Sequence, residues 1–164
     1  RGEWSLLYWG GLCKALIDHA RILPYLLELI GPQVRLDHDY CIFMEEGESR
    51  GGLHGGHGGT HFYDFRSGVI RNGLTVVTYF LTDAPAGAGG FACVPGSHKV
   101  SYPMPEGIRT CDDEMELVRH VEMKAGDVLL FLASAQTHGA YPWTGEQNRR
   151  MIFFQYRSRN LYVP

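Results

Sequence analysis

The feature that most constrains the fold is a series of short apolar segments, separated by turn-forming residues, that begins near residue 34. Segments rich in β-branched and aromatic residues and bounded by Gly, Pro or Asp are typical of β-strands. We expect strands at residues 34–44, 73–81, 91–94, 118–123, 128–132 and 151–156. A run of short strands with such turns predicts a mostly antiparallel sandwich or open barrel.

The first thirty residues show a different pattern. Between residues 4 and 30, Leu and Ile recur at helical spacing, Pro24 suits the first turn of a second helix, and Gly31 is a stop signal. We expect two short helices that cover one face of a sheet, and another helical turn at residues 112–119 with acidic residues at its start. The fold class is therefore mainly β with N-terminal helices.

Residues 34–44 alternate between two kinds of side chain, which predicts one straight strand. On this pattern, one face carries Val34, Leu36, His38, Tyr40, Ile42 and Met44, and the other carries Arg35, Asp37, Asp39, Cys41 and Phe43.

Length and charge set the class of protein. The 164 residues fit a single domain over residues 1–164 that is large enough to bury a core. The chain begins at Arg1 rather than at a methionine, which is compatible with a truncated N-terminus. A net charge of −3 without a basic stripe argues against nucleic acid and against anionic membranes as partners. No feature predicts an oligomeric state.

The cysteines and the hydropathy pattern bear on the compartment. Four widely spaced cysteines without a CxxC pair favour a reduced, intracellular chain, and we expect a cytoplasmic protein. No stretch is long and apolar enough for a membrane span, and no leader pattern precedes the first helix.

The glycine-rich segment 45–59 contains His54 and His57, and His61 follows it. One interpretation is a flexible surface loop, since glycine favours turns. The other is a binding segment, because histidine is an unusual choice for a plain linker and glycine lets a backbone approach a metal or ligand closely.

A second candidate site lies near the C-terminus. We expect His138 at the end of a buried strand and Arg149 at the start of the next one, with a short polar loop between them. A non-haem Fe(II) centre needs two histidines and a carboxylate with open positions, and an arginine beside it can grip the far carboxylate of a 2-oxo acid. A histidine satisfied within the core is the competing interpretation of His138.

Several motifs occur together and in order over most of the chain: RLDHDY at 35–40, LHGG at 53–56, GLTVV at 73–77, LTDAP at 81–85, GGF at 89–91, PGSHK at 95–99, AGDV at 125–128, and HG at 138–139 with RR at 149–150. With these motifs the chain resembles the phytanoyl-CoA dioxygenase (PhyH)-like family of Fe(II)/2-oxoglutarate-dependent oxygenases. The resemblance implies a double-stranded β-helix, a cupin-like jelly-roll barrel whose mouth holds the metal.

The resemblance also implies roles for individual residues. His54 and His138 would be iron ligands, and Arg149 would hold the C5 carboxylate of 2-oxoglutarate. Thr78 falls where the family contacts this cosubstrate, whereas Arg150 is expected to face the opposite side of its strand. His98 in the Pro-Gly-Ser-His turn is either directed to the pocket or a turn-stabilising side chain.

The chain departs from the family pattern at the third ligand, because Gly56 stands where the better-known members carry a carboxylate. Three alternatives remain open. A neighbouring side chain, His57, His61 or Asp64, completes the metal shell. A small residue leaves the position open, as in halogenases of the same superfamily. The protein is a non-catalytic jelly roll that binds a metal or ligand.

The expected activity is hydroxylation of a small organic substrate with Fe(II), 2-oxoglutarate and dioxygen, with ascorbate as reductant in vitro. Apolar side chains would keep water from the reacting centre, and we expect Val76, Phe80, Leu130 and Phe153 to do so. Acyl-CoA is less favoured as substrate, because no group of basic residues for its phosphates is evident.

Overall fold

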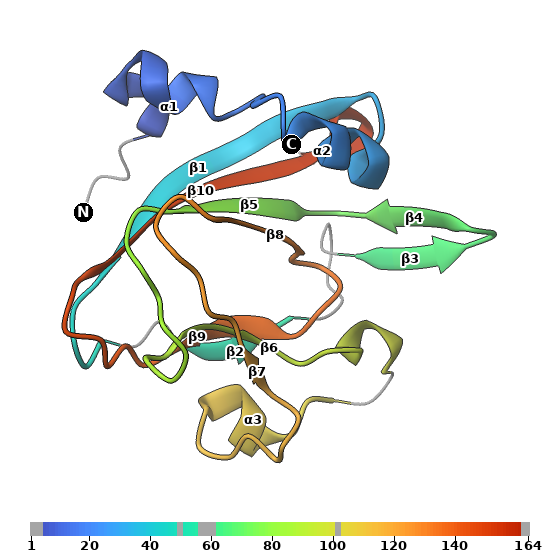
Figure 1. Cartoon of the computed structure of the whole chain (residues 1–164). Coiled ribbons are helices and arrows are strands. Elements are labelled where there is room, and N and C mark those ends of the chain that lie inside the picture. Colours follow the sequence, from blue (N-terminus) through green and yellow to red (C-terminus); the bar gives the residue numbers. More distant parts are fainter. Residues whose placement is uncertain (1–4, 49–50, 56–61, 101–102, 162–164) are drawn as a thin grey trace.

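Two four-stranded antiparallel sheets face each other in the computed structural model (Figure 1), which describes residues 5–48, 51–55, 62–100 and 103–161. The first sheet has, in spatial order, β1 (Val34–Met44), β10 (Arg149–Ser158), β5 (Thr75–Phe80) and β8 (Val128–Leu132). The second has β2 (Gly52–His54), β9 (His138–Tyr141), β6 (Gly90–Cys93) and β7 (Arg119–His120). This confirms the predicted mainly β jelly roll with N-terminal helices.

The main core lies between the two sheets. It is built by apolar side chains that β1, β5 and β10 direct inward, together with residues of the connecting loops. Its buried members are Met44, Val76, Phe80, Ala84, Ala88, Met123, Trp143, Met151 and Phe153. Leu129 and Phe131 of β8 pack against the same cluster, so the barrel interior is apolar at its centre.

The N-terminal segment covers the outer face of the first sheet (Figure 1). Its elements are the short 3₁₀ helix η1 (Leu6–Trp9), α1 (Gly11–Ala15) and α2 (Leu23–Ile30). Pro24 lies in the first turn of α2 and Gly31, at φ 97°, ends it, as the sequence predicts. Leu6 and Leu26 pack here against Val77, Ile152 and Phe154 of the sheet.

Two tyrosine hydroxyls tie this layer to the sheet. The hydroxyl of Tyr79 donates to the carbonyl of Leu16 at 2.9 Å, and that of Tyr156 donates to the carbonyl of Ile17 at 2.7 Å. Leu130 belongs to this outer layer. The prediction that it faces the barrel interior was wrong, because the alternation along β8 directs Leu129 and Phe131 inward instead.

A third cluster lies on the outer face of the second sheet under α3 (Glu106–Thr110), where Ile108 packs against Leu53 and Ala92. The predicted helical turn at 112–119 was wrong, since α3 precedes it and ends where Cys111 takes a left-handed conformation. The strand predicted at 118–123 is shorter than expected, because only Arg119–His120 pair with β6.

The prediction for residues 34–44 was correct for the strand and wrong for its faces. The pairing of β1 with β10 shifts between Leu36 and His38, which is a β-bulge. Because the extra residue reverses the alternation, Val34 and Leu36 face the outer helices whereas Tyr40 and Met44 face the interior.

Besides β9, three strands lie where the sequence pattern indicated none. β2 sits inside the glycine-rich segment that could have been a loop, and β3 (Tyr63–Arg66) pairs with β4 (Val69–Asn72) in a hairpin beyond β5 (Figure 1). β2 is only three residues long, and Gly52 at φ 79° passes so near the backbone of α3 that a Cβ would meet the Arg109 carbonyl oxygen at 2.2 Å. Such a strand has too few side chains to show a periodic pattern.

The structure shows the state of the cysteines and the length of the helices. All four cysteines are free: Cys13, Cys41, Cys93 and Cys111. Within the described ranges, no helix has both the length and the apolar character needed to span a bilayer.

Candidate functional site

Two predicted ligands, His54 and His138, lie directly opposite each other on paired strands. His54 closes β2, His138 opens β9, and they form a register pair between the two strands. Their ring centroids are 4.7 Å apart, with the ring planes tilted by 58°. Two histidines 84 positions apart in the sequence numbering, 138 minus 54, are thus held together by the sheet itself. His138 begins a strand rather than ending one, which corrects the sequence-based placement.

The orientation of His138 suits a metal ligand. Its Nδ1 donates a hydrogen bond to the backbone carbonyl of Gln136 at 2.7 Å, which leaves Nε2 as the nitrogen with a free lone pair. The ring packs against Phe131, at a centroid distance of 4.8 Å, and stacks near Phe91 at 6.1 Å. The backbone acceptor at Nδ1 fixes the tautomer of His138. The packing against Phe131 and Phe91 fixes the orientation of its ring.

The start of β9 is held by the Pro-Gly-Ser-His turn. The hydroxyl of Ser97, in η2 (Ser97–Lys99), accepts a hydrogen bond from the backbone N–H of Thr137 at 2.8 Å. His98 does not line the cavity near His138; its ring instead contacts Tyr63 edge-on at 5.4 Å. The turn therefore positions the residue before His138.

A cavity of about 430 Å³ opens beside the two histidines. Two of its walls differ in character. Leu74, Val76, Phe131 and Ala133 form the apolar wall, and His38, Tyr40 and Gln155 form a polar wall beside Gly55, His54 and His138. A cavity of this size, apolar with a few polar groups, is typical of a site for a small organic molecule.

The polar wall escaped the sequence-based prediction. The sequence pattern places His38 and Tyr40 on one face of a regular strand and indicates no functional role for them. It places Gln155 inside the predicted apolar strand 151–156, also without a role. Gln155 carried a signal, however, because it is the polar side chain in an otherwise apolar and aromatic strand. A polar residue in the inward phase of a barrel strand needs a partner or a ligand.

Arg149 is buried at the start of β10 with only 2% of its surface exposed. Its guanidinium lies near the rings of Phe80 and Trp143, at 5.8 and 5.9 Å from their centroids. Nη1 contacts the Met44 sulfur at 3.2 Å, and Nε has no hydrogen-bond partner among the described residues. Burial lowers the pKa of Arg149 to about 10, so the side chain is still a cation at neutral pH.

Gly90 borders this cation, and Thr78 is a second buried polar residue, on the neighbouring strand β5. Thr78 is 1% exposed, and its hydroxyl has no partner in the described part of the chain. Gly90 leaves room beside the guanidinium, because a Cβ there would lie 3.1 Å from the Arg149 Cζ. Arg150, on the other side of the strand, is exposed, as the alternation predicts. Within the described ranges, the Nε of this buried cation and the Thr78 hydroxyl have no hydrogen-bond partner, which fits an anionic ligand.

The third ligand is not among the residues brought together. His57, His61 and Gly56 lie outside the described residues. Asp64 is on β3, where its carboxylate pairs with Arg66 Nε at 3.6 Å. Within the described ranges, no three His, Cys, Asp or Glu side chains gather closely enough to hold a metal ion. The structure thus brings His54 and His138 together without Asp64.

The buried position of His138 predicts a pH-dependent stability for the metal-free protein. Burial is the main cause that lowers the pKa of His138 to about 4; the Gln136 carbonyl opposes this shift and His54 adds to it. Since the unfolded chain takes up this proton near pH 6.5, stability is fully present above that value and falls as the pH drops toward 4. Between pH 7.5 and 5.5 we expect a loss of about 1 kcal/mol from this group.

Chemical denaturation at both pH values measures this loss. His138→Gln is the control, because it removes the titrating group, and the difference between wild type and variant isolates its contribution from those of the other histidines. Equal pH dependence of the two proteins would contradict the assignment.

The chain is similar to known proteins in sequence and in fold. A family model described as phytanoyl-CoA dioxygenase (PhyH) matches residues 9–151. Among curated proteins, none matches the chain. Solved structures match over nearly the whole fold. One is HygX from Streptomyces hygroscopicus with iron bound, with a TM-score of 0.80 and 21% identity over 96% of this chain and 72% of that chain.

Two further structures show the same likeness. HygX with nickel, 2-oxoglutarate and hygromycin B bound gives a TM-score of 0.80 and 20% identity over 96% of this chain and 69% of that chain. SnoN, a non-haem α-ketoglutarate-dependent epimerase from nogalamycin biosynthesis, gives a TM-score of 0.67 and 20% identity over 94% of this chain and 60% of that chain. These identities establish a shared fold, whereas the family model covers most of the sequence. The chain therefore belongs to the phytanoyl-CoA dioxygenase (PhyH) family.

Proposed function

We propose that this protein is a non-haem Fe(II)- and 2-oxoglutarate-dependent dioxygenase that hydroxylates a small organic molecule. One observation carries the proposal: the cross-strand pair His54 and His138 opens to a cavity in a barrel that also buries Arg149, whose Nε has no hydrogen-bond partner among the described residues. Iron and 2-oxoglutarate binding by HygX support it, as does the cofactor named for SnoN. SnoN is an epimerase, so this fold does not by itself specify hydroxylation.

The residues present fit an iron ion. His54 and His138 supply two nitrogen donors from paired strands, and the hydrogen bond at Nδ1 of His138 leaves its Nε2 as the nitrogen that can bind a metal. Imidazole suits iron, and two histidines leave positions for exogenous ligands. His57 or Asp64 as third ligand remains part of the proposal. So does the alternative of a position left open at Gly56, as in a halogenase-like variant.

The residues also fit 2-oxoglutarate. Arg149 would pair with its C5 carboxylate, and the Thr78 hydroxyl would donate to the same group. Both are buried with unmet hydrogen-bonding capacity, so the dicarboxylate would satisfy atoms that are otherwise orphaned. Trp143 and Phe80 hold the guanidinium from two sides, and the indole N–H of Trp143 donates to the Gln147 carbonyl at 2.9 Å.

The iron, when bound, supplies oxidation of a C–H bond by dioxygen at the expense of 2-oxoglutarate. The protein would orient the substrate and exclude water from the reacting centre. Val76 and Phe131 border the cavity next to the histidines and exclude water from that side. Gln155 is the register partner of Val76 on the same sheet, so Tyr40 and Gln155 line the cavity beside the apolar residues, where a substrate would have its polar contacts.

Uncoupled turnover tests the proposal directly. We expect slow succinate release from 2-oxoglutarate in the presence of Fe(II), ascorbate and air, and loss of both turnover and Fe(II) binding in His138→Ala. His19→Ala, in the segment between α1 and α2, is the matched control and should behave as wild type. Full iron stoichiometry in His138→Ala, or no succinate from the wild type, would favour the rival reading of a non-catalytic binding protein.

Arg149→Leu should weaken 2-oxoglutarate binding by about 2–3 kcal/mol, on the order of a hundredfold in affinity, because it removes charge-assisted hydrogen bonds. Arg150→Leu is the control from the next position, since Arg150 is exposed on the other side of the strand. Anaerobic calorimetry with Fe(II)-loaded protein measures both. An unchanged affinity in Arg149→Leu would remove the clamp assignment.

Gly139→Ala should weaken metal binding by separating β2 from β9. A Cβ at Gly139 would lie 2.3 Å from the Gly52 carbonyl oxygen, so the strands that pair His54 with His138 must move apart. We expect at least about a tenfold loss of Fe(II) affinity, with lower thermal stability. Gly11→Ala, where nothing lies within 4 Å, is the control. Wild-type affinity in Gly139→Ala would show that the strand pairing does not set the site.

A further inference from the structure

The polar wall of the cavity is built by the bulge in β1. The shift between Leu36 and His38 turns Tyr40 inward, and both His38 and Tyr40 line the cavity. The Tyr40 ring stacks on Phe153 of β10, with centroids 4.8 Å apart and planes at 5°. His38 lies over the other end of this stack, 5.7 Å from Tyr40. The wall is therefore rigid before any ligand binds.

Tyr40 and Gln155 form a hydrogen-bonded pair on this wall. Gln155 Nε2 donates to the Tyr40 hydroxyl oxygen at 3.2 Å. The Tyr40 proton and the Gln155 Oε1 then remain for a ligand, and no described residue hydrogen-bonds to either. If the amide is turned over, Gln155 accepts from Tyr40 and the remaining groups are an amide N–H and the phenol oxygen. In both arrangements the pair presents one donor and one acceptor side by side.

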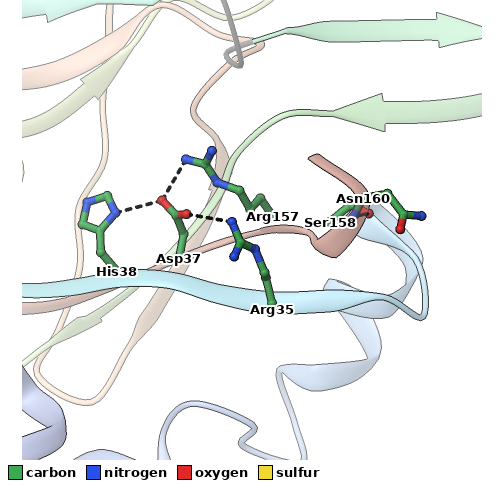
Figure 2. A network of polar contacts seen from close by, with 6 residues as sticks. All are labelled: Arg35, Asp37, His38, Arg157, Ser158 and Asn160. Carbon is green, nitrogen blue, oxygen red and sulfur yellow. Dashed lines mark hydrogen bonds and ion pairs between the residues drawn. The ribbon is translucent and has the colours of Figure 1, made fainter. Parts of the chain in front are cut away.

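The charged side chains next to this wall pair with one another (Figure 2). Asp37 Oδ2 accepts from Arg157 Nη2 at 2.8 Å and from His38 Nδ1 at 3.1 Å, and Asp37 Oδ1 is 3.6 Å from Arg35 Nη2. Asp37 thereby fixes the His38 ring, whose other nitrogen is left for the cavity. The carboxylate itself is occupied by its basic neighbours.

Among the described residues that line the cavity, none is Lys, Arg, Asp or Glu. Apart from the iron that His54 and His138 would hold, the described lining therefore offers no cation to the phosphates of a CoA thioester or to the carboxylate of an acid, and these groups would lose hydration there. The apolar wall of Leu74, Val76, Phe131 and Ala133 faces the same space, so a bound molecule needs one apolar face.

We propose that Tyr40 and Gln155 are the substrate-orienting pair, and that the substrate is an uncharged molecule with an apolar face and with adjacent hydrogen-bond donor and acceptor groups, such as vicinal hydroxyls. This inference rests on the proposed oxygenase function. It narrows the substrate class and assigns two residues to its recognition. The pair holds the hydroxylated edge, and the adjoining apolar residues Val76 and Phe131 support the apolar face.

Calorimetric titration of the protein loaded anaerobically with Fe(II) and 2-oxoglutarate tests the substrate class. The probe is phenyl β-D-glucopyranoside, which has vicinal hydroxyls and an apolar ring. Two matched probes keep the phenyl pyranoside frame: phenyl β-D-glucuronide adds a carboxylate, and 2-phenoxytetrahydropyran lacks the hydroxyls. Benzoyl-CoA is the third probe and represents the acyl-CoA alternative with its phosphates. We expect the glucoside to bind at least about tenfold more tightly than the other three, since each lacks a contact or brings an unpaired charge.

Variants test the two residues. Tyr40→Phe and Gln155→Leu should each weaken glucoside binding roughly three- to tenfold, as expected for one hydrogen bond, and the double variant should lose less than the product because both groups hold the same edge. Tyr25→Phe and Gln33→Leu, at exposed positions, are the matched controls.

The outcomes separate the two proposals. If wild type fails to bind 2-oxoglutarate, the oxygenase function falls first. If it binds 2-oxoglutarate but prefers the glucuronide or benzoyl-CoA, or does not bind the glucoside, the substrate class is overturned. If the glucoside binds equally well to wild type, Tyr40→Phe and Gln155→Leu, the pair is not the recognition element.

Discussion

The pairing of β2 with β9 is the contact on which the rest of the site depends. It brings together two histidines that no local motif connects, and it does so through main-chain hydrogen bonds rather than through a flexible loop. Glycine makes the close approach feasible, since side chains at Gly52 and Gly139 would collide with neighbouring backbone. A pair of ligands fixed by the register of a sheet is positioned more accurately than ligands on a loop.

Strand β10 connects the two ends of the barrel interior. Its inward residues run from Arg149 through Met151 and Phe153 to Gln155, so a buried cation lies at one end and a neutral polar group at the other. Six residues of extended strand separate these groups by roughly 20 Å. The apolar residues between them keep the two polar environments apart, which suits one small charged cosubstrate and one uncharged substrate.

Much of this architecture could be predicted from the sequence, and the misses have physical causes. The long apolar strands, the helix stop at Gly31 and the inward direction of Arg149 follow from local periodicity and turn chemistry. The bulge in β1 leaves no such signal, because the residues on both sides of it alternate regularly. Without the bulge, Leu36 and Tyr40 would share a face, so the composition of the polar wall depends on one unpaired residue.

The candidate site could be predicted only in part, because the sequence does not show which distant strands pair. His54 and His138 could be chosen from motifs, but their contact is a property of tertiary pairing between strands far apart in the chain. The sequence left the third ligand open near Gly56, because a glycine-rich segment specifies no preferred backbone conformation. Gln155 was visible as a polar residue in an apolar strand, yet its role becomes clear only beside Tyr40.

The hydroxyls of Tyr79 and Tyr156 limit how far the domain can be shortened from its N-terminal side. Each donates to a main-chain carbonyl of the N-terminal segment, at Leu16 or Ile17, from strands whose opposite faces enclose the reaction chamber. Removing that segment would leave two phenols without acceptors on an exposed apolar sheet. The N-terminal helices are thus an integral wall of the catalytic unit, and a shortened domain for expression should begin before them.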